Sequence, residues 1–557
     1  MHLDDLLRSV HDDPTADPTD LRLVAPDERA NRARRRDLTR RTFVLGTGLG
    51  LGAAGAAAAA PLTTPSASAA PKNHASPFTL GIASGDPTPT GIVLWTRLAL
   101  DPLAEDGVGA MGSKKVMVHW QISEDPQMHR VVRAGTEAAL PQFGFAVHAE
   151  VEGLRPGREY YYRFRTGRHE SRIGRTRTLP AAESRESLRA IAVSCSHWEG
   201  GHFTAYHHAA QERPDVVLAL GDYIYEGKEG TSTIRRHVGG TCLTLADYRR
   251  RYAQYKTDPN LQELHAAAPW IVSWDDHEIQ DNWAGLFPKD GVPSDAWTAR
   301  KAAGMRAFWE NMPLRRSRIP HDTSLPLHRR FRWGRVADLH VLDTRQFRDL
   351  QACHNGGKNW WFTDCAAMAD PSRTILGAEQ KRWLIDGFDR TEAAWQVLQQ
   401  GVFFARRDSK VGPGETLSSD AWDGYSADRD AMRDAWAARG LDATVLTGDV
   451  HVHFANEIKA DFRDVSSPTV GTELVTSSIT SGGDGSEEAG GQANVLKENP
   501  HIKFINNRRG YVSVDWHMDR MDARYMTVPF VEKVGAPIEV KRAFSVPRGQ
   551  QGLHPMG

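Results

Sequence analysis

Three short apolar runs, each followed directly by side chains that bind metal ions, constrain the fold of this chain most strongly. Residues 215–220 lead into Gly-Asp-Tyr-Ile-Tyr, residues 270–274 into Asp-Asp-His-Glu, and residues 443–447 into Gly-Asp-Val-His. Apolar runs of this length that end in turn residues predict buried strands. In α/β sheets the carboxyl ends of the strands carry the sites, and clustered oxygen and imidazole ligands indicate metal ions. The sequence therefore predicts a metal site at one edge of a sheet.

The rest of the 557-residue chain suggests more than one domain. Short alternating segments with turn signals predict an N-terminal β-sandwich module over residues 71–182, similar to fibronectin type III. Strand and helix patterns alternate through residues 183–557, which predicts an α/β catalytic domain. The expected strands are 189–195, 215–221, 270–274, 336–342, 395–402, 443–448, 473–481 and 510–516, and the expected helices are 204–212, 298–311, 377–390 and 428–439.

The first seventy residues resemble an export signal. Arg40 and Arg41 form a twin-arginine pattern, residues 46–60 are apolar and rich in Ala and Gly, and residues 67–69 offer a small-residue cleavage site. An N-terminal membrane anchor is the alternative, but the apolar stretch is only weakly hydrophobic. We expect a signal peptide over residues 1–70, export by the twin-arginine machinery and a secreted product.

The charge balance argues against a polyanionic partner. The formal net charge is −1, so no global field attracts nucleic acid, and no nucleic-acid partner is predicted. A run of three arginines at residues 249–251 would suit the basic groove of a nuclease. We expect these arginines to lie on the solvent-exposed face of a helix. Separately, we expect the protein to be a monomer.

The four cysteines have different predicted roles. Cys353 and Cys365 flank a Trp-rich segment, so a disulfide between them is plausible in an exported chain. Cys195 ends the apolar run 188–194, in the position of a strand-end ligand. A buried inert thiol is the alternative, but the three other strand-end motifs favour a ligand. The role of Cys242 stays open.

The whole set of motifs is similar to that of the PhoD-type alkaline phosphatases. These enzymes belong to the calcineurin-like metallophosphoesterase superfamily and are close to the purple acid phosphatases. The resemblance extends over about residues 78–530 and implies a β-sandwich core flanked by helices in four αββα layers. The matching segments are Ser-Cys-Ser at 194–196, Gly-Asp-Tyr-Ile-Tyr-Glu at 221–226, Trp-Asp-Asp-His-Glu at 274–278 with Asn282, Leu-Asp-Thr-Arg-Gln-Phe-Arg at 342–348, and Gly-Asp-Val-His at 448–451.

The resemblance implies an iron(III) ion held by Cys195, Asp222, Tyr225 and His451. Thiolate, phenolate and imidazole groups suit a transition metal, which agrees with this assignment. Cys195 stands where an aspartate is usual in the superfamily. This departure moves the ligand set away from the di-zinc type.

The resemblance also implies a calcium site that uses Asp222 as a bridging carboxylate, together with Asn282 and Asp449. Carboxylate and amide oxygens suit a hard cation such as Ca²⁺. Asp449 stands where a histidine is common in the superfamily. Asp276 is the alternative to Asn282, because the two positions lie close together in the sequence.

The expected chemistry is attack of a metal-bound hydroxide on phosphorus in line with the leaving group, without a covalent phosphoenzyme. His277 is the candidate that protonates or orients the leaving group, and a hydrogen-bond partner that orients a metal ligand is the alternative. Arg345 is the candidate that contacts the phosphoryl group. A structural ion pair of Arg345 with Asp343 or another carboxylate is the alternative.

We therefore expect a secreted hydrolase of phosphomonoesters and phosphodiesters. The alternative is a phospholipase D that acts on phospholipids at the same metal centre, although the full His-x-Lys-x-x-x-x-Asp motif of the usual phospholipase D family is absent. A non-enzymatic metal-binding or phosphate-binding protein is a weaker reading, because the ligand-bearing motifs are intact. Trp360 and Trp361 either line the entrance to the substrate site or pack within the core or a loop.

Overall fold

The fold is described from a computed structural model that covers residues 75–557. The predicted signal peptide lies outside these described residues. Within residues 75–557, no helix is both long enough and apolar enough to cross a membrane.

The first of two large sheets has the order β5-β2-β1-β11-β10-β9-β21-β22-β23-β24. Its strands are β1 (Ile82–Gly85), β2 (Gly91–Arg97), β5 (Ala146–Glu152), β9 (Leu188–Val193), β10 (Val216–Ala219), β11 (Trp270–Val272), β21 (Ile502–Trp516), β22 (Arg520–Val528), β23 (Glu539–Pro547) and β24 (His554–Pro555). Strands β9, β10 and β11 run parallel, with Val217 opposite both Ile191 and Trp270. Their carboxyl ends therefore meet at one edge.

The second sheet has the order β12-β13-β15-β17-β19-β18-β21 and shares the long strand β21 with the first. Its other strands are β12 (Arg329–Trp333), β13 (Ala337–Val341), β15 (Trp395–Gln399), β17 (Asp442–Thr447), β18 (His453–Lys459) and β19 (Thr469–Val475), and the short β20 (Gly485–Ser486) pairs with β21. Strands β13, β15, β17 and β19 run parallel.

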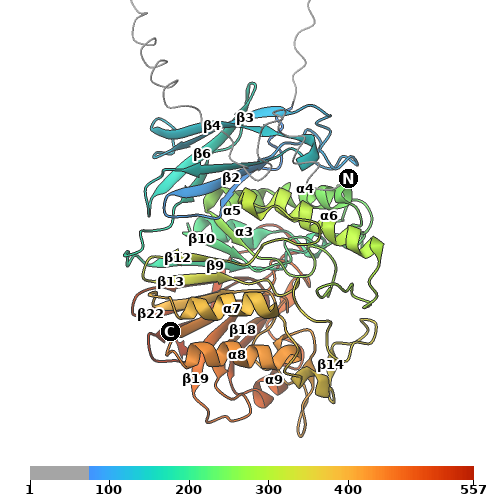
Figure 1. The fold of residues 1–557 in the computed structure, drawn as a ribbon, viewed down its shortest axis with the longest axis vertical. Helices are drawn as coiled ribbons and strands as arrows, with labels where there is room; N and C mark the ends of the chain where they lie inside the picture. The colour runs from blue at the N-terminus through green and yellow to red at the C-terminus, as the bar shows by residue number, and fades with distance from the viewer. Residues whose placement is uncertain (1–74) are drawn as a thin grey trace, which may run out of the picture. The chain divides into compact units, whose positions relative to one another are not determined.

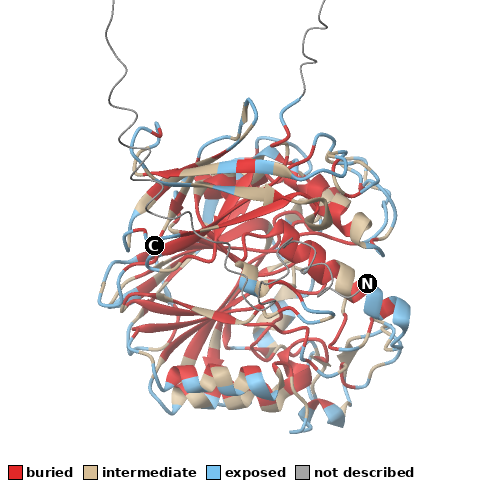
Figure 2. Ribbon diagram, turned by 45° about the horizontal axis from the view of Figure 1, so that its top comes forward, coloured by how far each residue is buried: buried red, intermediate tan, exposed pale blue. Residues whose placement is uncertain are grey.

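Apolar side chains from both sheets form one core. Leu218 and Val514 of the first sheet share it with Leu339 and Val397 of the second. The other face of the second sheet packs on helices α7 (Gly377–Phe388) and α8 (Ser426–Ala437), which run beneath it in Figure 1. Figure 2 shows that the buried residues are concentrated in the sheets and in the inner sides of these helices.

Four further helices lie near the first sheet. They are α3 (Thr204–Gln211), α4 (Leu245–Lys256), α5 (Pro259–Ala267) and α6 (Asp295–Asn311), and the short α9 (Gln492–Glu498) lies near β21. The sequence pattern identified α3, α6, α7 and α8 but missed α4 and α5. Helix α4 is polar along most of its length, so it carries little apolar periodicity. A capping box between Thr244 and Asp247 nevertheless marks its start.

A third, smaller sheet lies in the N-terminal part of the described chain and is formed by residues before β9. Its strands are β3 (Val116–Ser123), β4 (Val131–Ala139), β6 (Glu159–Thr166), β7 (His169–Glu170) and β8 (Gly174–Arg177). Tyr162 and Val118 of this sheet pack against Leu94 and Val147 of β2 and β5. Strands β1, β2 and β5 join the first large sheet, because Gly85 pairs in parallel with Trp270.

The expected strand at 473–481 is wrong over its second half. Strand β19 ends at Val475, and residues 476–481 form a loop. Ser and Thr hydroxyl groups in this loop bond to backbone carbonyls and compete with the sheet ladder; the Ser481 hydroxyl, for example, donates to the carbonyl of Cys195 at 2.9 Å. The loop therefore contacts the metal-ligand candidates and does not extend the sheet.

The predicted disulfide is confirmed. Cys353 and Cys365 are bonded and close a twelve-residue loop that carries β14 (Trp361–Phe362), which pairs with β16 (Leu417–Ser418). Cys195 and Cys242 are free and buried.

Candidate metal centre

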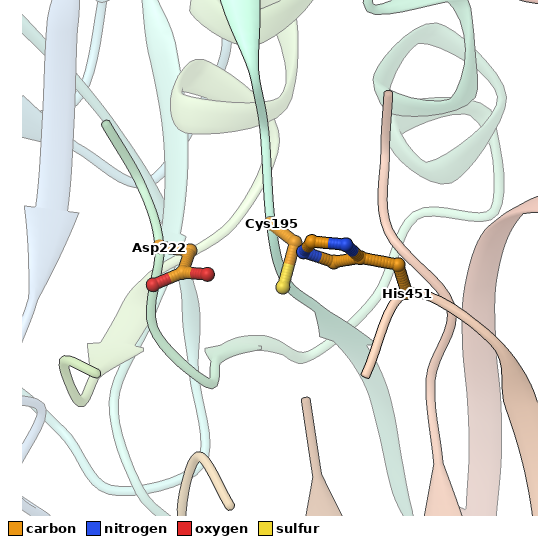
Figure 3. Close-up of side chains that lie close together, drawn as sticks. All are labelled: Cys195, Asp222 and His451. Atoms are coloured by element: carbon orange, nitrogen blue, oxygen red, sulfur yellow. The ribbon is translucent and has the colours of Figure 1, made fainter. Parts of the chain in front are cut away.

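The structure brings the four predicted iron ligands together. Cys195 follows β9, Asp222 and Tyr225 follow β10, and His451 follows β17. Figure 3 shows the side chains of Cys195, Asp222 and His451 close together. One donor atom from each lies within 4.8 Å of the others. The Tyr225 hydroxyl lies 3.1 Å from Asp222 Oδ2 and 2.9 Å from His451 Nε2. Four donors of different chemistry thus converge at one edge of the sheets.

The backbone turns sharply at most of the predicted ligands. The φ angles are 59° at Cys195, 53° at Asp222, 54° at Asn282, 62° at Asp449 and 58° at His451. This left-handed region costs a residue with a side chain roughly 1–2 kcal/mol. Such strain persists where the surrounding structure enforces it, and it concentrates at functional sites. The same backbone feature therefore marks five of the six predicted ligands.

Gly221 makes the turn before Asp222 possible. Its φ is 116°, and a Cβ atom there would lie 2.5 Å from Cβ of Asp275. Backbone bonds beyond the strands, from Cys195 N to the Gly221 carbonyl at 3.2 Å and from Ser196 N to the Asp222 carbonyl at 2.9 Å, hold the two turns side by side. Only glycine accommodates this close approach.

The donor set fits a cation. Burial, followed by repulsion from neighbouring carboxylates, raises the pKa of Cys195, Asp222 and Tyr225 well above their usual ranges. Among residues 75–557, no lysine or arginine side chain hydrogen-bonds to these three side chains. Burial also lowers the pKa of His451 to about 3, so its imidazole is neutral and can offer a lone pair. A bound metal ion would take the place of the protons that this site otherwise retains.

The predicted calcium ligands border the same position. Asn282 donates its Nδ2 to Asp281 Oδ1 at 2.8 Å, which leaves its amide oxygen for a cation. Asp276 accepts the backbone N–H of Asn282 at 2.6 Å, so the two alternative ligands are adjacent. Asp222 belongs both to the group with Cys195 and to a second group with Asp276 and His277. A carboxylate that bridges two metal ions must lie within reach of both ligand groups, and Asp222 does.

Asp449 lacks a protein partner. In the part of the chain that the structure describes, no group donates a hydrogen bond to its carboxylate. Burial, with added repulsion from Asp420, raises the pKa of Asp449 to about 6. A carboxylate in this setting is stabilised by a nearby cation.

His277, the predicted proton donor, lies between Glu226 and Tyr225. Its Nδ1 lies 2.7 Å from Glu226 Oε2, and its ring lies 4.1 Å from the ring of Tyr225. Burial alone would lower its pKa, but Asp276 and Glu226 outweigh burial and raise the pKa of His277 well above its usual value. The side chain is 20% exposed, so its other nitrogen can meet a substrate.

Arg345 is held in a buried ion pair. Its Nε lies 2.6 Å from Asp275 Oδ1, its Nη1 lies 3.3 Å from Asp420 Oδ1, and the side chain is 0% exposed. Asp343 accepts the backbone N–H of Arg345 and not its guanidinium. The structure therefore shows the ion-pair alternative, with Asp275 and Asp420 as the carboxylates, and the guanidinium does not reach a substrate from this position.

The arginine run in α4 is buried, which corrects the expectation of a solvated face. Arg249 pairs with Glu310 at 2.6 Å, and Arg251 donates to the carbonyls of Tyr225 and Gly227. Arg251 is 1% exposed. Arg251 thus supports the loop that carries Tyr225, whereas Arg249 ties α4 to α6, and the partly buried Arg250 lies 3.7 Å from Asp247. The three arginines therefore form no basic groove.

Ser481 is also part of the site, although no strand-end motif includes it. Its hydroxyl lies 2.6 Å from the Tyr225 hydroxyl. Arg509 donates to the carbonyls of both Ser481 and His451. These residues lie far along the chain from the strand-end motifs, and an isolated Ser or Arg carries no pattern that could identify them.

A second cluster of donors, His197, Glu199 and His237, is used for contacts within the protein. The Glu199 carboxylate accepts the backbone N–H groups of Gly230 and His237. The Tyr255 hydroxyl accepts two backbone N–H groups, which leaves its own proton for His237 Nε2 at 3.0 Å. The cluster supports the backbone of Tyr225 through the Tyr255 hydroxyl.

Comparisons with known proteins agree with this architecture. Residues 190–525 match the family model described as PhoD-like phosphatase, and residues 64–180 match the PhoD-like phosphatase N-terminal domain. Alkaline phosphatase D of Bacillus subtilis (strain 168) is 42% identical over 493 residues, which cover 87% of this chain and 83% of that protein.

Solved structures agree as well. A structure titled as that of PhoD superposes with a TM-score of 0.84 at 41% identity and covers 88% of this chain and 94% of the other. A purple acid phosphatase from yellow lupin (Lupinus luteus) seeds has a TM-score of 0.50 at 10% identity, covers 84% of this chain and 74% of its own, and shares the fold.

The mixed α/β fold and these matches define a phosphoric ester hydrolase. The chain belongs to the PhoD-like phosphatase family. The matches do not favour the phospholipase D alternative, because the matched family and relatives are phosphatases.

Proposed function

We propose that this protein hydrolyses phosphomonoesters and phosphodiesters at a centre that binds Fe³⁺ and Ca²⁺. The convergence of four donors at the strand ends, three of them on left-handed turns, carries this proposal. The proposed iron ligands are Cys195, Asp222, Tyr225 and His451, and the proposed calcium ligands are Asp222, Asn282 and Asp449. The free amide oxygen of Asn282 supports its choice over Asp276.

The finer architecture and localisation are part of the proposal. We assign an N-terminal module similar to fibronectin type III to residues 71–182 and the catalytic domain, with its αββα layers, to residues 183–557. The shared core between the two large sheets and the helices on the second sheet support the layered arrangement. The twin-arginine pattern supports secretion of a folded product, which we propose is a monomer.

The bound ions would supply positive charge for the phosphate group and lower the pKa of water at the site. The chain itself holds the groups that act with them. Asp222 would contact both ions. Arg345 acts as a positioning residue, because it holds Asp275, which lies in the same segment as Asp276. No residue of the chain needs to form a covalent bond to phosphorus in this arrangement.

His277 would give a proton to the leaving-group oxygen as the phosphorus–oxygen bond breaks. Glu226 holds Nδ1 of the ring, so Nε2 carries the transferable proton. The ring of Tyr225 fixes the plane of the imidazole. A positioned acid of this kind contributes about 10²- to 10⁴-fold to the rate.

The proposal predicts a definite substrate profile. The purified protein should release nitrophenol from p-nitrophenyl phosphate and bis-p-nitrophenyl phosphate, and a chelator should abolish the release because the ions hold the phosphate. Calcium should restore activity after mild chelation. Hydrolysis would be measured with and without chelator, beside choline release from phosphatidylcholine. Dominant choline release, or turnover that survives complete metal removal, would contradict the proposal.

Cys195→Ala should selectively remove iron. The thiolate is the softest ligand of the set, so its loss should lower the iron content severalfold and abolish any charge-transfer colour, with calcium retained. Elemental analysis and visible absorption would measure both. Cys242→Ala is the matched control, because Cys242 is equally buried but lies outside the donor cluster. Unchanged iron in Cys195→Ala would show that this thiol is only packed.

A further inference from the structure

Arg407 lies in the loop after β15 and has an unusual guanidinium. Its backbone N–H donates to Asp423 at 3.0 Å. Among residues 75–557, its side chain makes no hydrogen bond, and no carboxylate oxygen lies within ion-pair distance of it. A guanidinium that has left bulk water normally has an anionic or carbonyl partner. Its N–H groups are therefore available to a ligand.

Aromatic rings hold this guanidinium in place. Its Cζ lies 4.6 Å from the ring centre of Phe403, 4.9 Å from that of Trp361 and 5.6 Å from that of Phe454. Contacts with ring faces stabilise a cation by roughly 0.5–2 kcal/mol and leave its N–H edge free. Phe454 follows His451 closely in the sequence, and Trp361 lies in the disulfide-closed loop. These three rings form an aromatic cage around Arg407. The cage joins the disulfide-closed loop to the chain segment that follows His451.

Arg407 lies near enough to Asp449, a proposed calcium ligand, for their charges to interact. Burial lowers the pKa of Arg407, and Asp449 is the carboxylate that opposes this effect most strongly. Asp449 is the group without a protein hydrogen-bond donor described above. Both side chains are partly exposed, so the space near them is open to a solute.

The neighbouring Arg406, in contrast, is paired with carboxylates. Arg406 lies 3.3 Å from Asp408 and 3.1 Å from Glu415. Arg345 is likewise paired with two carboxylates. Arg407 differs from both because its donors are unused.

We propose that Arg407 is a substrate-binding residue whose N–H groups bind the phosphate oxygens of the ester at the metal centre. This inference rests on the proposed function and assigns to Arg407 the role that the sequence suggested for Arg345. The planar fork of a guanidinium matches two oxygens of a phosphate group. Because the aromatic cage holds the fork before substrate arrives, little side-chain entropy is lost on binding.

Arg407→Gln tests the proposal. The variant should raise KM for p-nitrophenyl phosphate and for bis-p-nitrophenyl phosphate at least tenfold, with kcat changed less. The inhibition constant of inorganic phosphate should rise in parallel. Metal content and the thermal midpoint should stay at the wild-type values, which a merely structural role of Arg407 would not allow.

Two further variants keep the test decisive. Arg407→Met fills the same aromatic cage without N–H groups, so it should reproduce the effect even if Arg407→Gln folds poorly. Arg542→Gln is the matched control, because the Arg542 Cζ also lies over a ring, 5.5 Å from that of Phe544, on β23. Its KM and phosphate inhibition should stay within twofold of wild type.

KM and phosphate inhibition within twofold of wild type in folded Arg407→Met would overturn the inference, and so would a fall in kcat alone. This failure differs from failure of the proposed function. In the latter case wild-type turnover would survive complete metal removal, whatever residue stands at position 407.

Discussion

Asp222→Asn is expected to lower kcat/KM by at least about 10³-fold, which corresponds to roughly 4 kcal/mol of lost transition-state stabilisation. Asp222 is shared by both donor groups of the site, so one neutral amide would weaken both ions. Asparagine has nearly the same shape and tolerates the left-handed φ of 53° at this position, so the fold should persist. Turnover of p-nitrophenyl phosphate, elemental analysis and thermal unfolding would measure the three effects.

The control for Asp222→Asn is Asp519→Asn. The Asp519 side chain is 76% exposed and lies in the turn between β21 and β22. Its replacement should change neither activity nor metal content. Wild-type rates and full metal content in Asp222→Asn would rule out the bridging assignment. Loss of one metal alone would restrict Asp222 to one ion.

Arg345→Ala is expected to lower the free energy of unfolding by about 3–5 kcal/mol, because it leaves Asp275 buried without its cation and leaves Asp420 with Arg348 as its remaining partner. Burial already raises the pKa of Asp275 to about 8, even though Arg345 acts to lower it. The variant should also bind calcium more weakly, because Asp276, which lies 3.9 Å from the same guanidinium, accepts the backbone N–H of the proposed ligand Asn282 and holds it in place. Denaturant unfolding and calcium titration would measure both changes.

Arg439→Ala is the matched control for an exposed ion pair. Arg439 pairs with Asp389 at 2.7 Å, but these side chains are 30% and 56% exposed. Solvent screens such a pair, so its loss should cost about 0–1 kcal/mol. Equal destabilisation by the two substitutions would mean that the buried network around Arg345 contributes no more than a surface pair.

Much of the fold and of the candidate site could be predicted because the relevant signals are local. An apolar run such as residues 215–220 and the polar turn after it are contiguous in the chain. The parallel strands β9 and β10 then bring the turns that carry Cys195 and Asp222 to one edge. Packing of the second sheet on the first places His451, which follows β17, beside them. The strand expected at 473–481 was too long, because its alternation of polar and apolar residues does not reveal that the hydroxyl groups bond to the backbone.

The sequence by itself determined the α/β class, the strand-end positions of the candidate ligands, the disulfide and the resemblance to phosphatases. Only the tertiary structure decided how the arginines are used. The carboxylates that pair with Arg345 lie 70 and 75 residues away from it in the sequence. Arg249 and Arg251 are buried, whereas Arg407 keeps free donors. A charged side chain is paired or unpaired according to which distant segments bury it and which polar groups those segments bring. A local sequence pattern contains no information on either.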